Sequence, residues 1–263
     1  MSANRSRVLL QPGYVLHRRA YRDSSLLVEL FTPQFGRVGV IARGARQPAS
    51  RLHGVLQPFR PLLVSWSGGE LPGLNAAEAD GLIPWLAGPA LMGGFYLNEL
   101  LMRLLHRFDP HPKLYDVYHR TMGMLGAIGQ NAVDGQAGRS DAPPAAFELE
   151  RRLRIFEKNL LEEIGYGLVL EHDADQGQAI EAQEMYVYHL MRGPVRLNPA
   201  AQGISSIQLM VRGQSLLDLA GGRLEDAISL REAKRLMRAA LAEQLGERPL
   251  NSRRLFMAQH DRS

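Results

Sequence analysis

Five short runs of alternating apolar residues occupy the first 80 residues of this 263-residue chain. A period of two is typical of β-strands, and it predicts strands over 13–19, 24–31, 37–43, 59–66 and roughly 71–79. An open sheet of five such short strands would leave two unpaired edges, whereas closing the sheet removes them. The pattern therefore predicts a small closed barrel over residues 1–80.

The period becomes helical after Pro84. One predicted helix ends before Asp109, and others cover 113–128, 147–164, 214–219 and 230–245, with a flexible connection at 129–144 and a hairpin at about 185–197. The expected fold class is α+β. We expect a barrel followed by a helical domain made of 81–166 and 204–263, and a loop-rich insertion at 167–203 that lacks zinc ligands.

The charge of the chain is divided unevenly along its length. Residues 1–69 contain ten Arg but only two acidic residues, Asp23 and Glu29, so this segment carries a net charge of +8. The whole chain carries +4, which leaves −4 for the remainder. A small segment with charge of nearly one sign favours a polyanionic partner.

The composition excludes several classes of protein. Without Cys, the chain cannot use a disulfide scaffold, a thiolate nucleophile, a Cys-ligated zinc or an iron–sulfur cluster. None of the three lysines, Lys113, Lys158 and Lys234, follows a Gly, so no Walker A loop exists. The apolar run at 8–10 is too short for a secretion signal, and no run of about 18 apolar residues predicts a membrane span. We therefore expect a cytoplasmic protein that does not associate with membranes.

A run of arginines at 37–51 is the strongest local signal for binding. Arg37 lies on the outward face of a predicted strand, and three more follow through a loop that contains Gly and Pro: Arg43, Arg46 and Arg51. A guanidinium suits phosphate because it stays charged at physiological pH and donates two hydrogen bonds from one planar fork. A face that served only solubility would normally mix both signs, so we interpret this run as a polyanion-binding surface.

Aromatic residues near these arginines allow two interpretations. Exposed rings on a barrel could stack on unpaired bases. Core packing is the more usual fate of Phe and Trp, and we favour it for the set as a whole. The residues concerned are Tyr14, Tyr21, Phe31, Phe35, Phe59 and Trp66.

Signals for a metal site or for catalysis are weak. His106, His111 and His119 lack the spacing of a metalloprotease motif, and the segment 172–175 supplies two potential ligands without a second pair. No Gly-x-Ser-x-Gly element is present to anchor a catalytic triad. We therefore expect no catalytic residue, no bound metal and no cofactor.

The last long predicted helix carries a second basic cluster. Its members are Arg231, Lys234, Arg235 and Arg238. This cluster could contact phosphate, or it could receive an acidic peptide with a hydrophobic end. It could equally be an ordinary surface face balanced by nearby acidic residues such as Glu232, because exposed charge alone says little.

Four blocks of residues, in order along the chain, together carry a resemblance to a known family. The first two are Gly13-Tyr-Val-Leu-His17-Arg18-Arg19 and Gly36-Arg37-Val38, the latter continued by Ala42-Arg43-Gly44-Ala45-Arg46 and Ser50-Arg51-Leu52. The others are Arg152-Leu-Arg154-Ile-Phe156-Glu157, continued by Gly165-Tyr166-Gly167, and Leu230-Arg231 with Lys234-Arg235, followed by Ser252-Arg253-Arg254. These blocks resemble the RecO family of bacterial recombination mediators, and the resemblance covers nearly the whole chain.

The resemblance implies an N-terminal OB-fold barrel, a helical domain and no enzymatic activity. It implies a nucleoid-associated protein that binds single- and double-stranded DNA, anneals complementary strands and, with RecR, helps load RecA onto DNA coated by single-strand binding protein. It also implies contact with the acidic C-terminal tail of that coating protein. Transferred by position, the expected DNA contacts are Arg37, Arg43, Arg46 and Arg51, together with Arg18 and Arg19.

The chain departs from the family at the zinc module that many members carry. Where those members have the first Cys pair, this chain has His172-Asp-Ala-Asp175, and the second pair is missing. We therefore predict no zinc. Three other functions remain as alternatives: an OB-fold RNA-binding or translation-associated factor, a metal-dependent nuclease and a pure protein scaffold.

Overall fold

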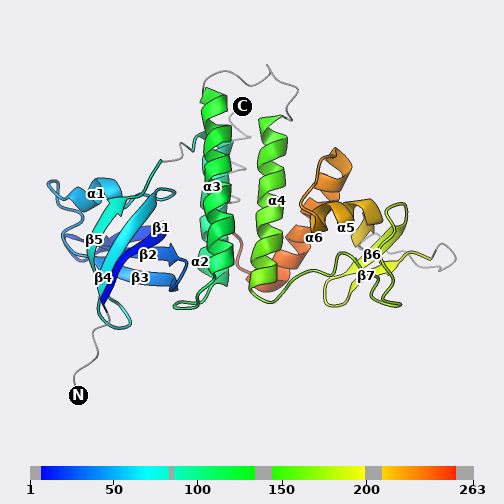
Figure 1. Ribbon diagram of the computed structural model, residues 1–263, viewed down its shortest axis with the longest axis horizontal. Helices are drawn as coiled ribbons and strands as arrows, with labels where there is room; N and C mark the ends of the chain where they lie inside the picture. The colour runs from blue at the N-terminus through cyan, green and yellow to red at the C-terminus, as the bar shows by residue number, and fades with distance from the viewer. Residues whose placement is uncertain (1–6, 83–85, 134–143, 199–208, 253–263) are drawn as a thin grey trace. The chain divides into compact units, whose positions relative to one another are not determined.

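The computed structural model describes residues 7–82, 86–133, 144–198 and 209–252 of the chain (Figure 1). The chain divides into two compact units, described separately below. The N-terminal unit comprises Met1–Ala145 with Leu250–Ser263, and the C-terminal unit comprises Ala146–Pro249. Among the helices of the described residues, none combines the length and apolar character needed to cross a membrane.

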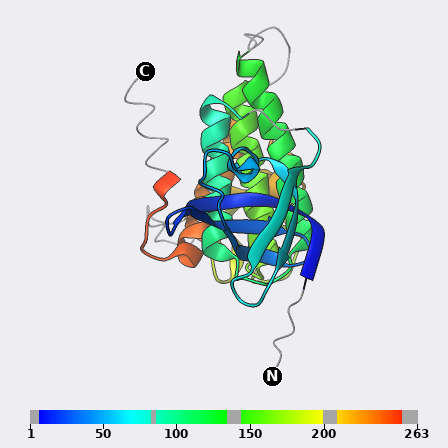
Figure 2. The same cartoon turned by 90° about the vertical axis from the view of Figure 1, so that its left-hand side faces the viewer.

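The predicted barrel is confirmed. Five strands close in the order β1-β2-β3-β5-β4, and Figure 2 shows them wrapping around one another. Their bounds are Arg7–Tyr21 (β1), Ser25–Thr32 (β2), Gly36–Ala42 (β3), Pro61–Ser67 (β4) and Gly73–Ala79 (β5). Only β3 and β5 pair in parallel, through Ile41 and Gly73, so this short junction closes a ring that is otherwise antiparallel.

Alternation along β2 and β3 fills the barrel interior. Val38 and Val40 are fully buried in the core, and each lies opposite a core residue of β2, Leu30 and Val28 respectively. Residues opposite each other in an antiparallel ladder point to the same face, so the register brings both apolar sets inside. A slip of one residue would move these side chains out of the core, which is why the sequence specifies this pairing.

Strand β1 is long enough to pair on both sides because it bends. It pairs with β4 through its first half and with β2 through its second half, and the register shifts between Val8 and Gln11 and again between Val15 and His17. Such bulges bend a strand and increase its twist, which helps a five-stranded sheet to close. The loop after β3, predicted to be irregular, contains the short helix α1 at Arg51–Val55.

Two helices complete the N-terminal unit: α2 (Gly88–Leu104) and α3 (Pro112–Val133). A buried hydrogen-bond chain joins them to the barrel, since Asn98 Nδ2 donates to the Leu16 carbonyl at 2.9 Å and Tyr118 donates to Asn98 Oδ1 at 2.6 Å. Tyr14 of β1 packs edge-on against Tyr118, with ring centroids 5.0 Å apart. Because buried polar groups need partners, these contacts fix α2 and α3 against β1.

The loop between α2 and α3 lies on strand β3. The Phe108 N–H donates to the Arg37 carbonyl at 2.9 Å, and Arg107 forms an ion pair with buried Glu29. Gly36 has φ +61° and approaches the loop so closely that a Cβ atom would overlap the Asp109 carbonyl. Glycine is therefore required at this position both for the backbone angle and for the space.

The C-terminal unit combines three helices with a small sheet. The elements are α4 (Ala145–Glu163), β6 (Met185–His189), β7 (Gly193–Arg196), β8 (Leu209–Arg212), α5 (Gly213–Ala220) and α6 (Ala227–Leu245), and the sheet order is β7-β6-β8. The predicted hairpin is confirmed as β6–β7, whereas the four-residue strand β8 was not predicted. The inward face of α4 includes Leu149, Leu153, Phe156 and Leu160, which are buried.

The compact units group the helices differently from the expected domains. α2 and α3 belong with the barrel, and α4 belongs with the segment 167–203 that we expected to be a separate insertion. Periodicity identifies a helix and its apolar face, but it carries no information on which other element covers that face.

Candidate nucleic-acid interface

Two neighbouring loops present several of the exposed arginines of the barrel. One is the turn between β1 and β2, at 22–24, and the other follows β3, at 43–50; we call them the loop pair. Arg43, Arg46 and Arg51 are exposed in or directly after the second loop. Arg19 is exposed near the end of β1. Four of the six arginines predicted to contact DNA are therefore accessible to a ligand.

Arg46 ties the loop pair together. Its Nη1 donates to the carbonyls of Arg22 and Asp23, both at 3.1 Å, and its backbone N–H donates to the Ser24 carbonyl at 2.9 Å. The sequence identified Arg46 only as a charge. The structure shows that Arg46 also has a structural role, because its three hydrogen bonds satisfy carbonyls of the other loop.

Arg37 and Arg18 are engaged within the barrel unit. The Arg37 side chain is 17% exposed, its Nη1 donates to the carbonyls of Leu105 (2.9 Å) and Met102, and its Nε lies 3.4 Å from Glu29. Burial lowers the pKa of Arg37, although Glu29 opposes this. Arg18 is half-buried and donates to the Leu56 carbonyl at 3.0 Å. DNA contact by Arg18 and Arg37 stays a prediction. Their present hydrogen bonds disfavour it, because a guanidinium that donates to backbone carbonyls has fewer donors for phosphate.

The barrel aromatics are largely internal, as favoured from the sequence. Tyr14, Phe31, Phe59 and Trp66 are buried, and the half-buried Phe35 packs edge-on against Trp66 at 5.3 Å. Tyr21 differs from the others. It ends β1 beside the loop pair, it is half-buried, and the Arg22 guanidinium lies over its ring, 5.2 Å from the centroid. No sequence signal distinguished Tyr21 from the five core rings.

In the basic cluster on α6, one member is paired with a carboxylate and three are exposed. Lys234 Nζ lies 2.9 Å from both carboxylate oxygens of Glu150, so an acidic partner in α4 already neutralises it. Arg231, Arg235 and Arg238 are exposed. Their spacing of four and three residues puts them on one face of α6. The accessible basic surface on this helix is therefore these three arginines.

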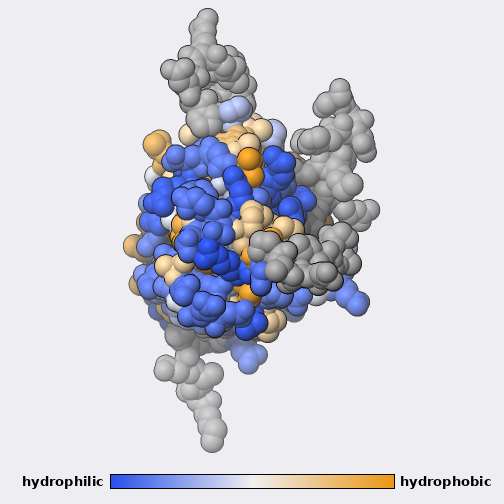
Figure 3. Space-filling model, turned by 90° about the vertical axis from the view of Figure 1, so that its right-hand side faces the viewer, coloured by the Kyte–Doolittle hydropathy of each residue, from blue (hydrophilic) through white to orange (hydrophobic). Residues whose placement is uncertain are grey.

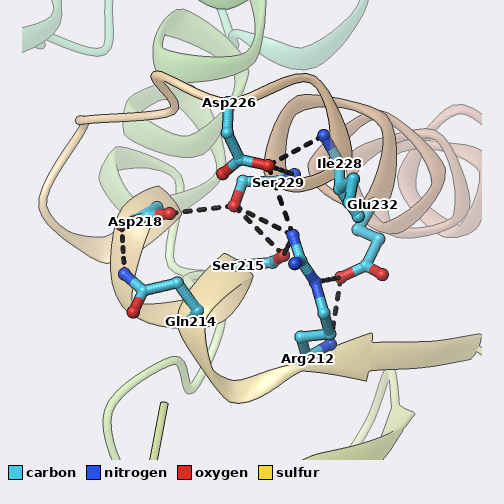
Figure 4. Close-up of polar contacts among 8 residues, drawn as sticks. All are labelled: Arg212, Gln214, Ser215, Asp218, Asp226, Ile228, Ser229 and Glu232. Carbon is cyan, nitrogen blue, oxygen red and sulfur yellow. Dashed lines mark hydrogen bonds and ion pairs between the residues drawn. The ribbon is translucent and has the colours of Figure 1, made fainter. Parts of the chain in front are cut away.

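A buried polar network positions α6, and sequence reasoning missed it (Figure 4). Arg212, the last residue of β8, donates its backbone N–H to Glu232 at 3.0 Å. Ser229 of α6 is fully buried and donates to Asp218 of α5 at 2.8 Å. Asp226 caps α6 by accepting from the N–H groups of Ile228 and Ser229, both at 2.9 Å.

The network is structural in character. The Arg212 Nη2 lies 3.3–3.4 Å from Ser215, Ser229 and Asp226, and its Nε lies 3.6 Å from the Glu232 carboxylate, so the cation is held among groups of the network. No histidine or lysine belongs to it in Figure 4, so it lacks a group suited to take up a proton near neutral pH. Its effect is to fasten α6 to β8 and α5. The Asp226 cap was the one detectable signal, since Asp is a preferred N-cap residue.

The segment 172–176, in the insertion predicted to lack zinc ligands, is organised by a carboxylate. Asp173 is buried, and its Oδ1 accepts from the N–H groups of Asp175 (2.8 Å) and Gln176 (2.9 Å) while its Oδ2 accepts from the Arg196 N–H (2.9 Å). Asp175 forms an ion pair with Arg192. Within the described residues, no three His, Asp or Glu side chains are arranged to hold a metal. These residues do not fit a zinc ion, because the central carboxylate is already occupied by backbone donors.

Figure 3 shows one face of the molecule on which hydrophilic side chains predominate. The apolar colour is confined to small groups among them. The exposed large apolar residues of the C-terminal unit are few within its described part: Tyr166, Val169, Met191 and Ile228. This surface therefore supports polar and charged contacts better than a broad apolar one.

Comparisons with known proteins identify the family. The family model described as recombination protein O N terminal matches residues 7–81, and the model described as recombination protein O C terminal matches residues 144–254. The DNA repair protein RecO of Alkalilimnicola ehrlichii is 49% identical over 251 residues, covering 95% of this chain and 91% of that protein. The proteins of the same name from Nitrosococcus oceani and Methylococcus capsulatus are 45% and 47% identical, over 95% of this chain and 93% and 94% of theirs. The chain therefore belongs to the RecO family of DNA repair proteins, which are recombination mediators and not enzymes.

Proposed function

We propose that this chain binds single- and double-stranded DNA through its barrel, anneals complementary strands and, with RecR, helps load RecA onto DNA coated by single-strand binding protein. Family membership over nearly the full length supports this role. The observation that carries the barrel assignment is the exposure of Arg43, in the second loop of the loop pair, and of Arg51, directly after it. The buried core aromatics leave a surface on which cations, and not apolar rings, dominate.

The proposed mechanism is electrostatic. Arginines that neutralise phosphates release condensed counterions, so the affinity for DNA falls as salt rises. Two strands repel each other through their phosphates, and a cationic surface reduces that repulsion. Since phosphate contacts leave the base edges free, the strands can still pair while bound. Annealing then needs no nucleotide hydrolysis by this chain.

The prediction for this function concerns Arg43 and Arg51, which have no hydrogen-bond partner among the described contacts. Replacing both with Ala removes two phosphate contacts, so the slope of log affinity against log salt should fall by about 1.8 for duplex and about 1.4 for single-stranded DNA. Fluorescence anisotropy of labelled DNA over a salt series measures both slopes. The annealing rate of complementary strands, with and without coating protein, should fall in parallel.

The matched control is Lys113→Ala with Arg120→Ala, which removes two exposed charges from α3. If both double variants change the slope equally, the interface assigned to the barrel is wrong. Matched single-stranded RNA discriminates the remaining alternative. Tighter binding to RNA than to DNA would favour an RNA-binding factor.

The basic face of α6 is a second proposed site. Arg231, Arg235 and Arg238 lie on one helix face, and the polar network of Figure 4 holds that helix in place. We propose that this face binds the acidic tail of single-strand binding protein, with a second DNA contact as the competing outcome. A labelled acidic tail peptide should lose affinity in the triple Ala variant, whereas loss of DNA affinity alone would support the competing outcome.

A further inference from the structure

We propose that Tyr21 and Arg22 form a stacking site for one unpaired base, and that Arg46 is the positioning residue that holds this site in place. The inference rests on the proposed DNA-binding function and deepens it. It names single-stranded DNA as the ligand that this end of the barrel distinguishes from duplex. The argument starts from the geometry of the β1–β2 turn.

Arg22 is held in an unusual backbone conformation at the surface. Its φ is +51°, in the left-handed region that few residues other than glycine adopt. The side chain is exposed, and its guanidinium carbon lies 5.2 Å from the centre of the Tyr21 ring. A cation over an aromatic face is an attractive arrangement. The ring thus supports one side of the guanidinium and leaves the other side toward solvent.

The register of the barrel places this pair near the exposed arginine of the second loop. Tyr21 is the direct partner of Ser25 across the β1–β2 ladder. On the other side of β2, Leu26 pairs with Ala42, and Arg43 is the next residue after Ala42. Tyr21 and Arg43 therefore flank the start of β2 from its two neighbouring strands. A strand whose base stacks on Arg22 would have a backbone phosphate within reach of Arg43.

Arg46 supplies the rigidity that the site needs. The Arg46 guanidinium donates to the carbonyls of Arg22 and Asp23, at 3.1 Å each. These hydrogen bonds hold the backbone of Arg22, whose side chain would stack on the base. The third bond, from the Arg46 N–H to the Ser24 carbonyl, joins the second loop to the end of the turn. These bonds keep Arg22 in its left-handed conformation. Arg46 thus acts on DNA through Arg22, in addition to its charge.

A planar guanidinium that already lies over a ring suits an unpaired base. Single-stranded nucleic acids present bases that stack on aromatic side chains or on guanidinium planes. In a duplex both faces of each internal base are covered by its neighbours, so the site is closed to it. Phosphate contacts alone do not provide this distinction, since both forms of DNA carry phosphates.

The decisive experiment replaces Arg22 with Lys, which keeps the charge and removes the planar group. Affinity for a single-stranded oligonucleotide should fall about fivefold or more, with duplex affinity and both salt slopes unchanged. An oligonucleotide that carries 2-aminopurine reports stacking directly through fluorescence quenching, which should weaken in R22K. Arg7→Lys is the matched control, because Arg7 is exposed on the same strand, lies outside the predicted DNA contacts and should tolerate the change.

A second variant tests the role of Arg46. Arg46→Ala should weaken the 2-aminopurine quenching as much as R22K does, although Arg22 is still present, and thermal melting should show that the barrel remains folded. If R22K binds single strands as the unmodified chain does, the stacking site is wrong while the proposed function stands. If the unmodified chain binds neither form of DNA at low salt, the proposed function itself fails.

Discussion

At the residue scale, arginine has two opposite roles in this protein. Arg43 and Arg51 are exposed, whereas Arg154 of α4 has a side chain only 7% exposed and lies 2.6 Å from the fully buried Glu157. A buried ion pair tolerates the loss of one partner poorly, because the remaining charge has no water to solvate it. Both kinds of arginine belong to segments that resemble the family, so the resemblance alone does not separate binding from structure.

The prediction at this scale compares two arginines of one helix. Arg154→Ala should lower the free energy of unfolding by about 3–5 kcal/mol, since it removes the ion-pair partner of a fully buried carboxylate. Arg152→Ala, which removes a more exposed pair with Glu148, should cost at most about 1 kcal/mol. Urea unfolding followed by far-UV circular dichroism measures both. Equal losses of unfolding free energy would show that the buried Arg154–Glu157 pair stabilises the protein no more than the Arg152–Glu148 pair does.

At the element scale, the segment 172–180 is organised by the hydrogen bonds of one carboxylate. Asp173 joins its own turn to strand β7 through the N–H of Arg196. Burial by itself would raise the pKa of Asp173, but the backbone N–H groups of Gln176, Arg196 and Asp175 hold the pKa below its ordinary value, with help from Arg192. A carboxylate that accepts several N–H bonds prefers its charged form.

This arrangement predicts a dependence of stability on acid. Because the pKa of Asp173 is depressed in the folded state, its contribution to stability is complete above the unfolded pKa of about 3.9 and is lost as pH falls through the lower folded value. Asp173→Asn should destabilise the C-terminal unit by about 1–3 kcal/mol near neutral pH, because buried N–H groups lose acceptors. It should also weaken the loss of stability below about pH 4.

Asp175→Asn is the control for this prediction. Asp175 is exposed, and only its backbone N–H takes part in the turn. Unfolding curves at several acidic pH values compare the two variants. Asp226 also has a depressed pKa, so D173N should reduce the acid effect without abolishing it. An unaltered pH profile in D173N would show that Asp173 does not stabilise the folded state.

At the scale of the whole molecule, the chain leaves the N-terminal unit and returns to it at the end. Leu250 is buried in that unit, and the Glu99 carboxylate of α2 accepts from the N–H groups of Asn251 and Ser252, both at 2.8 Å. Burial would raise the pKa of Glu99, but the Ser252 and Asn251 donors and Arg103 hold it below its usual value. The stability of the barrel unit thus depends on residues about 150 positions further along the chain.

The prediction at this scale uses Trp66, which is buried in the barrel of the N-terminal unit. Leu250→Ala should lower the unfolding free energy reported by tryptophan fluorescence by about 2–5 kcal/mol, because it removes a buried side chain and leaves a cavity. Leu82→Ala is the matched control, as that side chain is 95% exposed and should change stability by less than about 0.5 kcal/mol. If the two variants behave alike, the chain end does not stabilise the N-terminal unit.

The sequence by itself determined the elements, the sign of the charge on the barrel and, through its four blocks, the family. Alternation predicted the barrel strands and helical spacing predicted most helices, because both patterns depend on residues close together in the chain. The excess of arginine over 1–69 pointed to the barrel as the cationic surface. Strand β8 escaped prediction because four residues are too few to show a period.

Only the tertiary structure decided which residues of one type are exposed and which are engaged in internal contacts. Arg37 was chosen from its position on a strand, yet its neighbours across the fold make it a partner of Glu29 and of backbone carbonyls. Tyr21 looked like the core aromatics, but the fold leaves it half-buried at the end of β1, with the Arg22 guanidinium over its ring. Exposure and partners depend on contacts between residues far apart in the chain, and local spacing carries no record of those contacts.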